Sequence, residues 1–245
     1  FNGKAFFFAQ DSANDGYEPW ISDGTAAGTF QISDLNPGAA SSVPNLEPGD
    51  PVDNIYTLAA VVGNQLYFAA NNGLLGTELW VTDGTAAGTR LVSNIYTETS
   101  SSTINSSYPR NLINVNGTLF FSAISRNNGR ELWQSNGTAG GTRMVVDLTP
   151  GFTGGLTVTN YVGSWASIGD TLIFTGANYV TNSFGNEPYA YNQATATLTL
   201  LKDIYPGSLS SFPLNYHSYR TPAGVDLVAF GANNNSTGGE LWFTD

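Results

Sequence analysis

Carboxylate side chains recur at a fixed spacing along this chain, and carboxylates can bind cations or transfer protons. Each of these glutamates lies two residues before an aromatic residue, so the two side chains would share one face of a strand. If the repeats are arranged around an axis, the glutamates would form a ring that could hold calcium, which takes six to eight oxygen ligands. Alternatively, each glutamate accepts hydrogen bonds from backbone N–H groups of the preceding loop, and we favour this structural role. In five places a glutamate lies two residues before an aromatic residue: Glu18 and Trp20, Glu78 and Trp80, Glu131 and Trp133, Glu187 and Tyr189, Glu240 and Trp242.

A second polar motif begins three residues after each tryptophan of the first three copies. The Asp or Asn side chain can accept hydrogen bonds from backbone N–H groups two residues ahead, and glycine tolerates a positive φ, so the motif predicts a hairpin turn. An enzyme needs one active site rather than several identical ones, so the repetition indicates architecture. The three copies are Asp23-Gly24-Thr25, Asp83-Gly84-Thr85 and Asn136-Gly137-Thr138.

One loop partly matches a calcium-binding loop. Asp11 and Asp15 stand at its first and fifth positions and Gly16 at its sixth, but Ala13 has no side-chain oxygen at the third. Asp11 and Asp15 are therefore a partial calcium motif, and ordinary turn chemistry is the favoured interpretation. No other cofactor or metal is predicted.

The sequence offers little catalytic chemistry. His217 is the only histidine and there is no cysteine, so a typical zinc site and a cysteine nucleophile are excluded. No serine lies in a nucleophile-elbow motif that would accompany His217 in a catalytic triad. A carboxylate pair for glycoside hydrolysis depends on the fold, and no pair stands out in the sequence. We predict that the chain is not an enzyme.

Aromatic residues that break the repeat are the better candidates for partner contacts. We expect these side chains to be exposed, where they offer a large apolar area with a polar tip that suits contacts with proteins or sugars. The candidates are Tyr108, Trp165, Tyr179, Tyr216 and Tyr219.

Charge and composition narrow the possible partners. With 19 acidic and 8 basic residues, the chain has a formal net charge of -11, which repels phosphate backbones and anionic lipids. No segment approaches the roughly 18 consecutive apolar residues of a membrane-spanning helix. We therefore expect neither nucleic-acid binding nor membrane insertion.

The elements that position these residues follow from an internal repeat. An apolar segment ending in phenylalanine precedes each glutamate, for example Phe6-Phe7-Phe8 and Leu66-Tyr67-Phe68. The closing phenylalanine lies 12 residues before the tryptophan in four copies, which suggests a constant register. Successive triplet aromatic residues are 60, 53, 56 and 53 residues apart, enough for four short strands with their loops. Four-stranded units are typical of β-propeller blades, and a β-solenoid is the main alternative.

We predict an all-β propeller of four-stranded antiparallel blades, with four complete units and a partial fifth. The apolar segment is expected to be the inner strand, and the long Ser/Pro/Asn-rich segment is expected to lead to the outer strand. The fifth unit stops at Asp245, where the Asp-Gly-Thr turn would begin, so we expect a fragment of a longer polypeptide that continues with Gly-Thr and more repeats. The units are about 1–61, 62–115, 116–168, 169–223 and 224–245.

The eight residues Glu78-Leu79-Trp80-Val81-Thr82-Asp83-Gly84-Thr85 resemble the bacterial repeat family named for its Glu-Leu-Trp-x-x-Asp-Gly-Thr signature, and the resemblance covers the whole chain. Residues 37–44 and 206–213 match a further Pro-Gly-x-x-Ser-Ser-x-Pro feature. Pro19, Pro188 and Tyr189 depart from the signature. The resemblance implies large secreted or surface-attached bacterial proteins with a propeller-like fold and no common catalytic activity.

The resulting functional prediction is a non-catalytic extracellular or cell-surface scaffold or adhesion protein, whose propeller loops meet a protein partner or assembly. A carbohydrate-binding, lectin-like propeller is the first alternative, and a glycan-active enzyme is the second. Fold alone does not choose among these functions.

Overall fold

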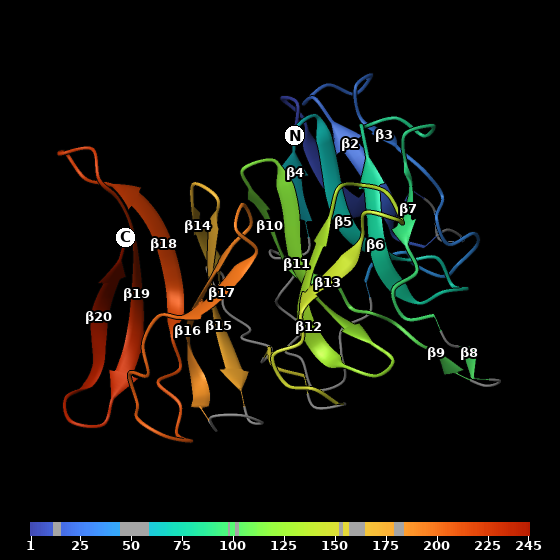
Figure 1. Cartoon of the computed structure of the whole chain (residues 1–245). Coiled ribbons are helices and arrows are strands. Elements are labelled where there is room, and N and C mark those ends of the chain that lie inside the picture. The colour runs from blue at the N-terminus through green and yellow to red at the C-terminus, as the bar shows by residue number, and fades with distance from the viewer. Residues whose placement is uncertain are drawn as a thin grey trace. The chain divides into compact units, whose positions relative to one another are not determined.

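The computed structural model describes residues 1–11, 16–44, 59–97, 99–100, 103–151, 154–156, 165–178 and 184–245. These residues form strands and turns without a helix, so the all-β prediction is confirmed (Figure 1). Accordingly, the described residues include no helix long and apolar enough to cross a membrane.

Five antiparallel sheets follow one another along the chain, and neighbouring strands in each sheet are consecutive in sequence. A separate two-stranded ribbon joins β8 (Thr99–Ser100) to β9 (Thr103–Ile104). The first sheet contains β1 (Ala5–Ala9), β2 (Glu18–Ser22) and β3 (Phe30–Gln31), and the second contains β4 (Ala59–Val62), β5 (Gln65–Asn71), β6 (Thr77–Thr82) and β7 (Arg90–Ser93). The third contains β10 (Arg110–Val115), β11 (Thr118–Ser125), β12 (Gly129–Ser135) and β13 (Arg143–Val146). The fourth contains β14 (Trp165–Ile168), β15 (Thr171–Asn178), β16 (Phe184–Asn192) and β17 (Thr197–Leu200), and the fifth contains β18 (Leu214–Arg220), β19 (Asp226–Asn234) and β20 (Gly238–Thr244).

The first strand of the later sheets was misplaced by the sequence prediction. The long linker does not lead to an outer strand of its own unit, because β10 pairs with β11 and β14 pairs with β15. The physical reason is a two-residue turn, which forces adjacent strands to pair. Residues 63–64, 116–117 and 169–170 form these turns, with positive φ at Gly63, at both Asn116 and Gly117, and at Gly169. Each predicted unit after the first therefore starts one strand later than the sheet to which it corresponds.

The first sheet also has a different register from the second, fourth and fifth sheets. Phe68 lies opposite Trp80, and Phe230 lies opposite Trp242, as a constant spacing predicts. In the first sheet, however, Phe7 rather than Phe8 lies opposite Trp20. The connection between β1 and β2, residues 10–17, is one residue longer than the equivalent residues 71–77. The equal sequence spacing thus concealed a one-residue slip, which exchanges the two faces of β1.

The number of strands per sheet differs from the prediction as well. Three sheets have four strands, whereas the first and the fifth each have three in the described residues. The fifth corresponds to the expected partial unit, extended by β18, which the sequence had assigned to the unit before it.

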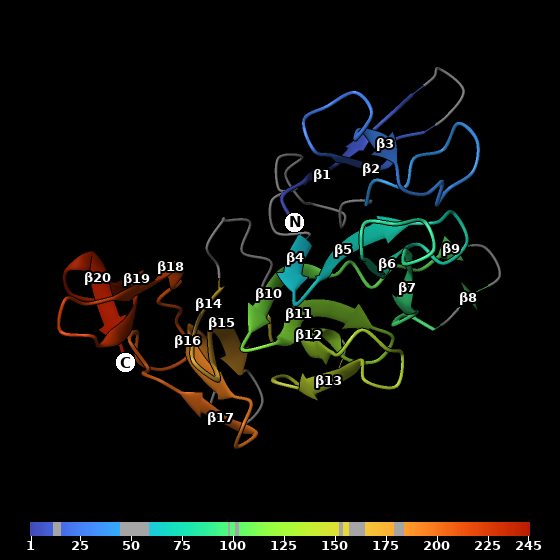
Figure 2. The ribbon, with the colours of Figure 1, turned by 90° about the horizontal axis from the view of Figure 1, so that it is seen from above.

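The chain forms two compact units, and the third sheet contributes residues to both. In the unit that contains the first two sheets, Phe6 and Phe8 pack on Phe68 and Trp80, and Tyr67 and its neighbours pack on the third sheet. In the other unit, the fourth and fifth sheets share a core that includes Ile173 and Phe230, and Figure 2 shows these two sheets side by side. Sheets covered on both faces explain why β5 is apolar almost throughout instead of alternating, and why all six residues of β6 are buried although three of them are polar.

Candidate functional site

The repeated glutamates are buried in the first four sheets, where they hold the linker to the next sheet. Each side chain accepts a hydrogen bond from the backbone N–H group 17 residues downstream. The predicted partner, the preceding loop, was therefore wrong. In the second sheet β7 runs antiparallel to β6 and its last residue, Ser93, lies opposite Leu79, so the chain leaves the sheet beside Glu78. The N–H to carboxylate distances are 2.8 Å from Leu35 to Glu18, 2.9 Å from Ile95 to Glu78, 3.0 Å from Leu148 to Glu131 and 2.9 Å from Ile204 to Glu187.

The same carboxylate also binds a second residue, later in the linker. These residues are Ser42, Ser107, Gly155 and Ser211. Glu78 accepts from the N–H of Ser107 at 3.2 Å and from its hydroxyl at 2.6 Å, and Glu187 accepts from Ser211 in the same way at 3.0 and 2.7 Å. The carbonyl oxygen of this second residue accepts a hydrogen bond from a backbone N–H group of the following sheet. These bonds run from Asn71 to Ser42, from Ile124 to Ser107, from Ala177 to Gly155 and from Asn233 to Ser211. The glutamate therefore connects neighbouring sheets through the linker.

Burial changes the acidity of these carboxyl groups. Removal from water raises the pKa of Glu78 and of Glu131 to about 7, although several hydrogen bonds to the carboxylates act in the opposite direction. Burial also raises the pKa of Glu18 and Glu187. In the part of the chain that the structure describes, no three His, Asp or Glu side chains gather into a possible metal site. The glutamates are instead engaged one by one with backbone N–H groups.

The Asp-Gly-Thr segments lie in the turns that join the last two strands of their sheets, between β2 and β3, β6 and β7, and β12 and β13. Asp83 Oδ1 accepts from the N–H of Thr85 at 2.9 Å and from its hydroxyl at 2.7 Å, and Thr85 Oγ1 accepts from Gly88. The same contacts recur around Asp23 and Asn136. Gly24, Gly84 and Gly137 have φ between 86° and 92°, where a side chain would be strained. Hydrogen bonds from Thr25 and Thr85 lower the pKa of Asp23 and Asp83.

The five candidate contact residues are distributed unequally between core and surface. Tyr108 and Trp165 are half-buried, and the Trp165 ring lies 5.7 Å from that of Phe174. Tyr216 is only 2% exposed, which corrects the expectation that it faces a partner. Its ring stacks on Phe230, and its hydroxyl lies 3.0 Å from Thr175 Oγ1, so it belongs to the core between the fourth and fifth sheets. Tyr179 lies outside the described residues.

Asp15 of the partial calcium motif also lies outside the described residues, whereas Asp11 lies within them. The triplet aromatic residues Trp80 and Tyr189 are buried, and Trp20, Trp133 and Trp242 are half-buried. They pack within or beside the sheets and are not gathered in an open site.

Tyr219 is exposed and lines a groove at one end of the fourth and fifth sheets. The groove has a volume of about 300 Å³ and lies between the β14–β15 turn and the β18–β19 hairpin. Ser218 Oγ donates a hydrogen bond of 2.8 Å to the Ser167 carbonyl oxygen across the two sheets. Arg220 and Asp226 complete the lining. No sequence pattern indicated this groove, because its two sides come from segments about 50 residues apart.

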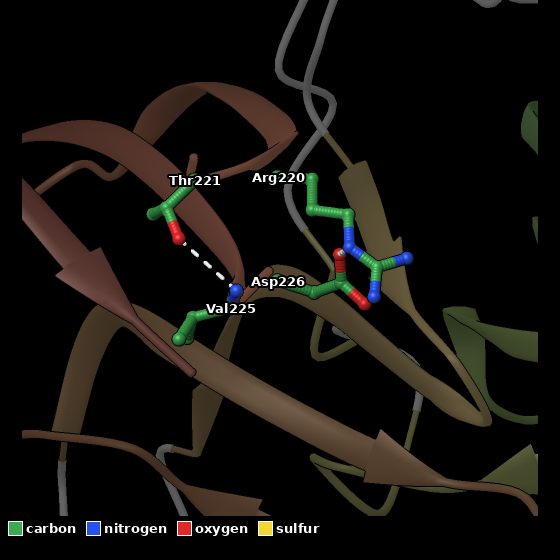
Figure 3. Close-up of polar contacts among 4 residues, drawn as sticks. All are labelled: Arg220, Thr221, Val225 and Asp226. Carbon is green, nitrogen blue, oxygen red and sulfur yellow. Dashed lines mark hydrogen bonds and ion pairs between the residues drawn. The ribbon is translucent and has the colours of Figure 1, made fainter. Parts of the chain in front are cut away.

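The ion pair in this groove is open to water (Figure 3). Arg220 Nε lies 3.6 Å from Asp226 Oδ1, and the two side chains are 71% and 51% exposed, so the pair contributes little to stability. The hairpin behind it is fixed by a 3.0 Å bond from the Val225 N–H to Thr221 Oγ1. The groove thus presents a cation and an anion, whereas the Tyr219 ring lies 6.2 Å from that of Phe243 on β20. Exposed charges of both signs suit polar ligands with hydroxyl or carboxylate groups.

A second open surface is the outer face of the fifth sheet. Leu241 and Phe243 on β20 are 66% and 53% exposed, whereas the equivalent Leu79 and Val81 on β6 are fully buried. Leu209 and Phe212 are exposed in the linker before β18. Grouped exposed apolar side chains of this kind mark contact surfaces. Phe212 and Leu241 line one groove, and we call Leu241, Phe243 and Phe212 the β20 face.

The fold and these surfaces define a class of all-β repeat proteins with sheets joined by buried carboxylates. Neither protein-family models nor curated proteins match the sequence. Among solved structures, a puromycin hydrolase is 12% identical with a TM-score of 0.47, and the match covers 94% of this chain and 32% of that protein. Prolyl oligopeptidase B from Galerina marginata is 12% identical with a TM-score of 0.42, covering 96% and 30%, and an endo-arabinase from Bacteroides thetaiotaomicron is 11% identical with a TM-score of 0.34, covering 99% and 89%. At these values the similarities support no statement about activity.

Proposed function

We propose that this chain is a non-catalytic scaffold or adhesion module of an extracellular or cell-surface bacterial protein, and that it meets a protein partner or assembly. The observation that carries the proposal is the β20 face, where large apolar side chains are exposed although their equivalents in the second sheet are buried. Protein contact surfaces typically contain such residues at their centre. The acidic net charge argues against nucleic acid as the partner.

The repeat supports a structural rather than a catalytic use of the acidic residues. Glu78 and its equivalents are engaged with linker N–H groups, and Asp83 and its equivalents are engaged in turns. A β-propeller of four-stranded antiparallel blades is the architecture that we propose. The resemblance to the Glu-Leu-Trp-x-x-Asp-Gly-Thr family supports a bacterial secreted or surface location.

A photo-crosslinking experiment tests the scaffold proposal. A photoreactive amino acid is placed at position 243, and at position 74 as a control, because Leu74 is also exposed but lies outside the β20 face. In bacteria that produce the protein, we expect one dominant protein adduct from position 243 only. The purified partner should bind the Leu241→Asp variant at least about 10-fold more weakly and the Leu74→Asp variant unchanged. Equal labelling from both positions, or turnover of peptide or polysaccharide substrates, would contradict the proposal.

Carbohydrate binding is the second candidate, and the Tyr219 groove is the observation that favours it. The exposed Tyr219 ring, which lies 6.2 Å from that of Phe243, can stack on a sugar. Arg220 and Asp226 of the same hairpin can donate to and accept from hydroxyl groups. On a glycan array, Tyr219→Ala should remove any binding that the native chain shows. Tyr17→Ala is the matched control, because Tyr17 is also exposed but is distant from Tyr219 in the sequence. Binding that survives Tyr219→Ala would exclude this groove.

A further inference from the structure

Each of the first four sheets ends in the same way. A last short strand pairs with the strand that carries the glutamate, and the chain then leaves as an acidic or amide residue followed by leucine or isoleucine. The N–H group of that aliphatic residue donates to the buried glutamate. The four exits are Asp34-Leu35, Asn94-Ile95, Asp147-Leu148 and Asp203-Ile204.

The fifth sheet has the strand and the glutamate that would bind such an exit segment, but in the described residues no exit segment pairs with them. Glu240 lies opposite Ala232, as Glu78 lies opposite Ala70. In the described residues β20 is the last strand of its sheet, and its far edge pairs with no other strand. Glu240 is exposed, and no hydrogen bond to its side chain is found in that part of the structure.

A groove of about 410 Å³ lies beside Glu240, where an entering segment would lie. Ser211, Phe212, Ala232 and Leu241 are among the residues that line it. Its lining is mainly apolar, and an aliphatic side chain is the group that such a groove accepts. The equivalent aliphatic residues Ile95, Leu148 and Ile204 are buried in their sheets.

We propose that the edge of β20, the Glu240 carboxylate and this groove form a docking site for an unpaired polypeptide segment of the repeat's own pattern. The segment adds to β20 as a short antiparallel strand, and it then donates the N–H group of a leucine or isoleucine that follows Asp or Asn to Glu240. The aliphatic side chain fills the groove. Strand addition to an open edge gives affinity through backbone bonds, while the carboxylate and the groove give sequence preference.

This inference rests on the proposed scaffold function and names the chemistry of the partner. A second folded copy of the chain is not the occupant, because its four described segments of this pattern already pair within their own sheets. The occupant is instead a further segment of the repeat pattern that is not already paired with a strand of another sheet.

The test extends the chain after Asp245 with the sequence of residues 84–96, which ends in Asn-Ile-Tyr. We expect the extended chain to melt at least about 3 °C higher than the native chain. The gain should mostly disappear in the Glu240→Ala background, and also when the appended copy carries the Ile95→Asp change. A scrambled extension of equal composition is the control and should leave the melting temperature unchanged.

Two outcomes would overturn the proposal. The first is a gain below about 1 °C, or an equal gain with and without Glu240. The second is a native chain that sediments as a dimer and becomes monomeric on Leu241→Asp, because a second copy would then cover this face. Crosslinking from position 243 is independent of these measurements, so a failed extension with a successful crosslink rejects the docking segment and keeps the scaffold function.

Discussion

At the scale of single residues, burying the glutamates costs free energy, because their carboxyl groups lose contact with water. A carboxylate removed from water is stable only when hydrogen bonds replace its hydration, and Glu78 has four donors: the N–H groups of Ile95, Tyr96 and Ser107, and the Ser107 hydroxyl. The buried backbone N–H groups of the linker need an acceptor in turn. The side chain and the linker therefore satisfy each other, and either one without the other would destabilise the sheet.

The raised pKa values predict a pH-dependent stability. Burial raises the pKa of Glu78 to about 7, above its ordinary value of 4.5, so the folded protein holds this proton more tightly than the unfolded chain does. The resulting stabilisation is fully present below pH 4.5 and is lost as the pH rises through 7, at most about 3 kcal/mol for this group. The free energy of unfolding of the native chain, measured with urea, should therefore decrease between pH 5 and pH 8.

The Glu78→Gln variant isolates this contribution. It removes the titrating group but keeps one acceptor oxygen, so its stability should vary less between pH 5 and pH 8. It should be less stable than the native chain at pH 5 by about 1 to 3 kcal/mol, because some linker donors lose their acceptor. Glu240→Gln is the control, since Glu240 is exposed, and should change neither quantity. A pH dependence equal in Glu78→Gln and the native chain would show that other groups cause it.

The turn residues give a second prediction at this scale. Asp83→Ala removes the acceptor of the Thr85 N–H and hydroxyl, and should lower the free energy of unfolding by about 1 kcal/mol. Asp83→Asn should cost much less, because Asn136 makes the same bonds in the third sheet. Equal losses in the two variants, measured by urea unfolding, would mean that the charge rather than the acceptor oxygen matters.

At the scale of strands and loops, the sequence predicted what is repeated within one sheet and missed what depends on pairing between segments. β5 follows from its long apolar run, and β6 follows from the repeated Glu-Leu-Trp triplet and the Asp-Gly turn after it. β4 has alternating half-exposed residues and only four positions, so its partner is decided by the turn at Gly63. Gly63-Asn64, Asn116-Gly117 and Gly169-Asp170 are hairpin signals that could have located these strands.

The same distinction explains which features of the candidate sites could be predicted from the sequence. The regular spacing identified every glutamate, but the loop that each one binds is fixed only once β7 and its equivalents run back along the sheet. Tyr216 breaks the repeat in sequence, yet the register of β18 turns it inward toward Phe230. The Tyr219 groove requires two distant segments to meet, and local patterns contain no information about that meeting.

Loop chemistry gives the prediction at this scale. Protein backbone and side-chain groups supply the bonds of the described turns, such as the Gly224 N–H donating to the Thr221 carbonyl oxygen and Asn72 Oδ1 accepting from the Leu75 N–H at 2.9 Å. Removal of divalent ions with a chelator should therefore lower the melting temperature by less than about 10 °C in a chain of this size. Calorimetry with and without chelator measures the difference. A larger fall would indicate a stabilising calcium site, and Asp11→Asn would then test the Asp11–Asp15 loop.

At the scale of the whole molecule, stability is a sum over sheets and the contacts between successive sheets. The second sheet is covered on both faces, by the first and the third. The fifth sheet packs on the fourth through Phe230 and Tyr216, and its other face is the exposed β20 face. Equivalent sequences therefore occupy unequal environments.

Hydrogen exchange should reveal this inequality. The amides of β20 have one paired edge and half-exposed side chains, so they should open with a smaller free energy than those of β6, whose six residues are all buried between two sheets. We expect peptides from residues 238–244 to exchange at least about 10-fold faster than peptides from residues 77–82, since a difference of about 1.4 kcal/mol in opening free energy already gives that ratio. β16, which pairs on both edges with β15 and β17, is the matched control and should resemble β6. If β20 is as protected as β6, the β20 face is covered in solution, and the protection should then fall on dilution or in the Leu241→Asp variant.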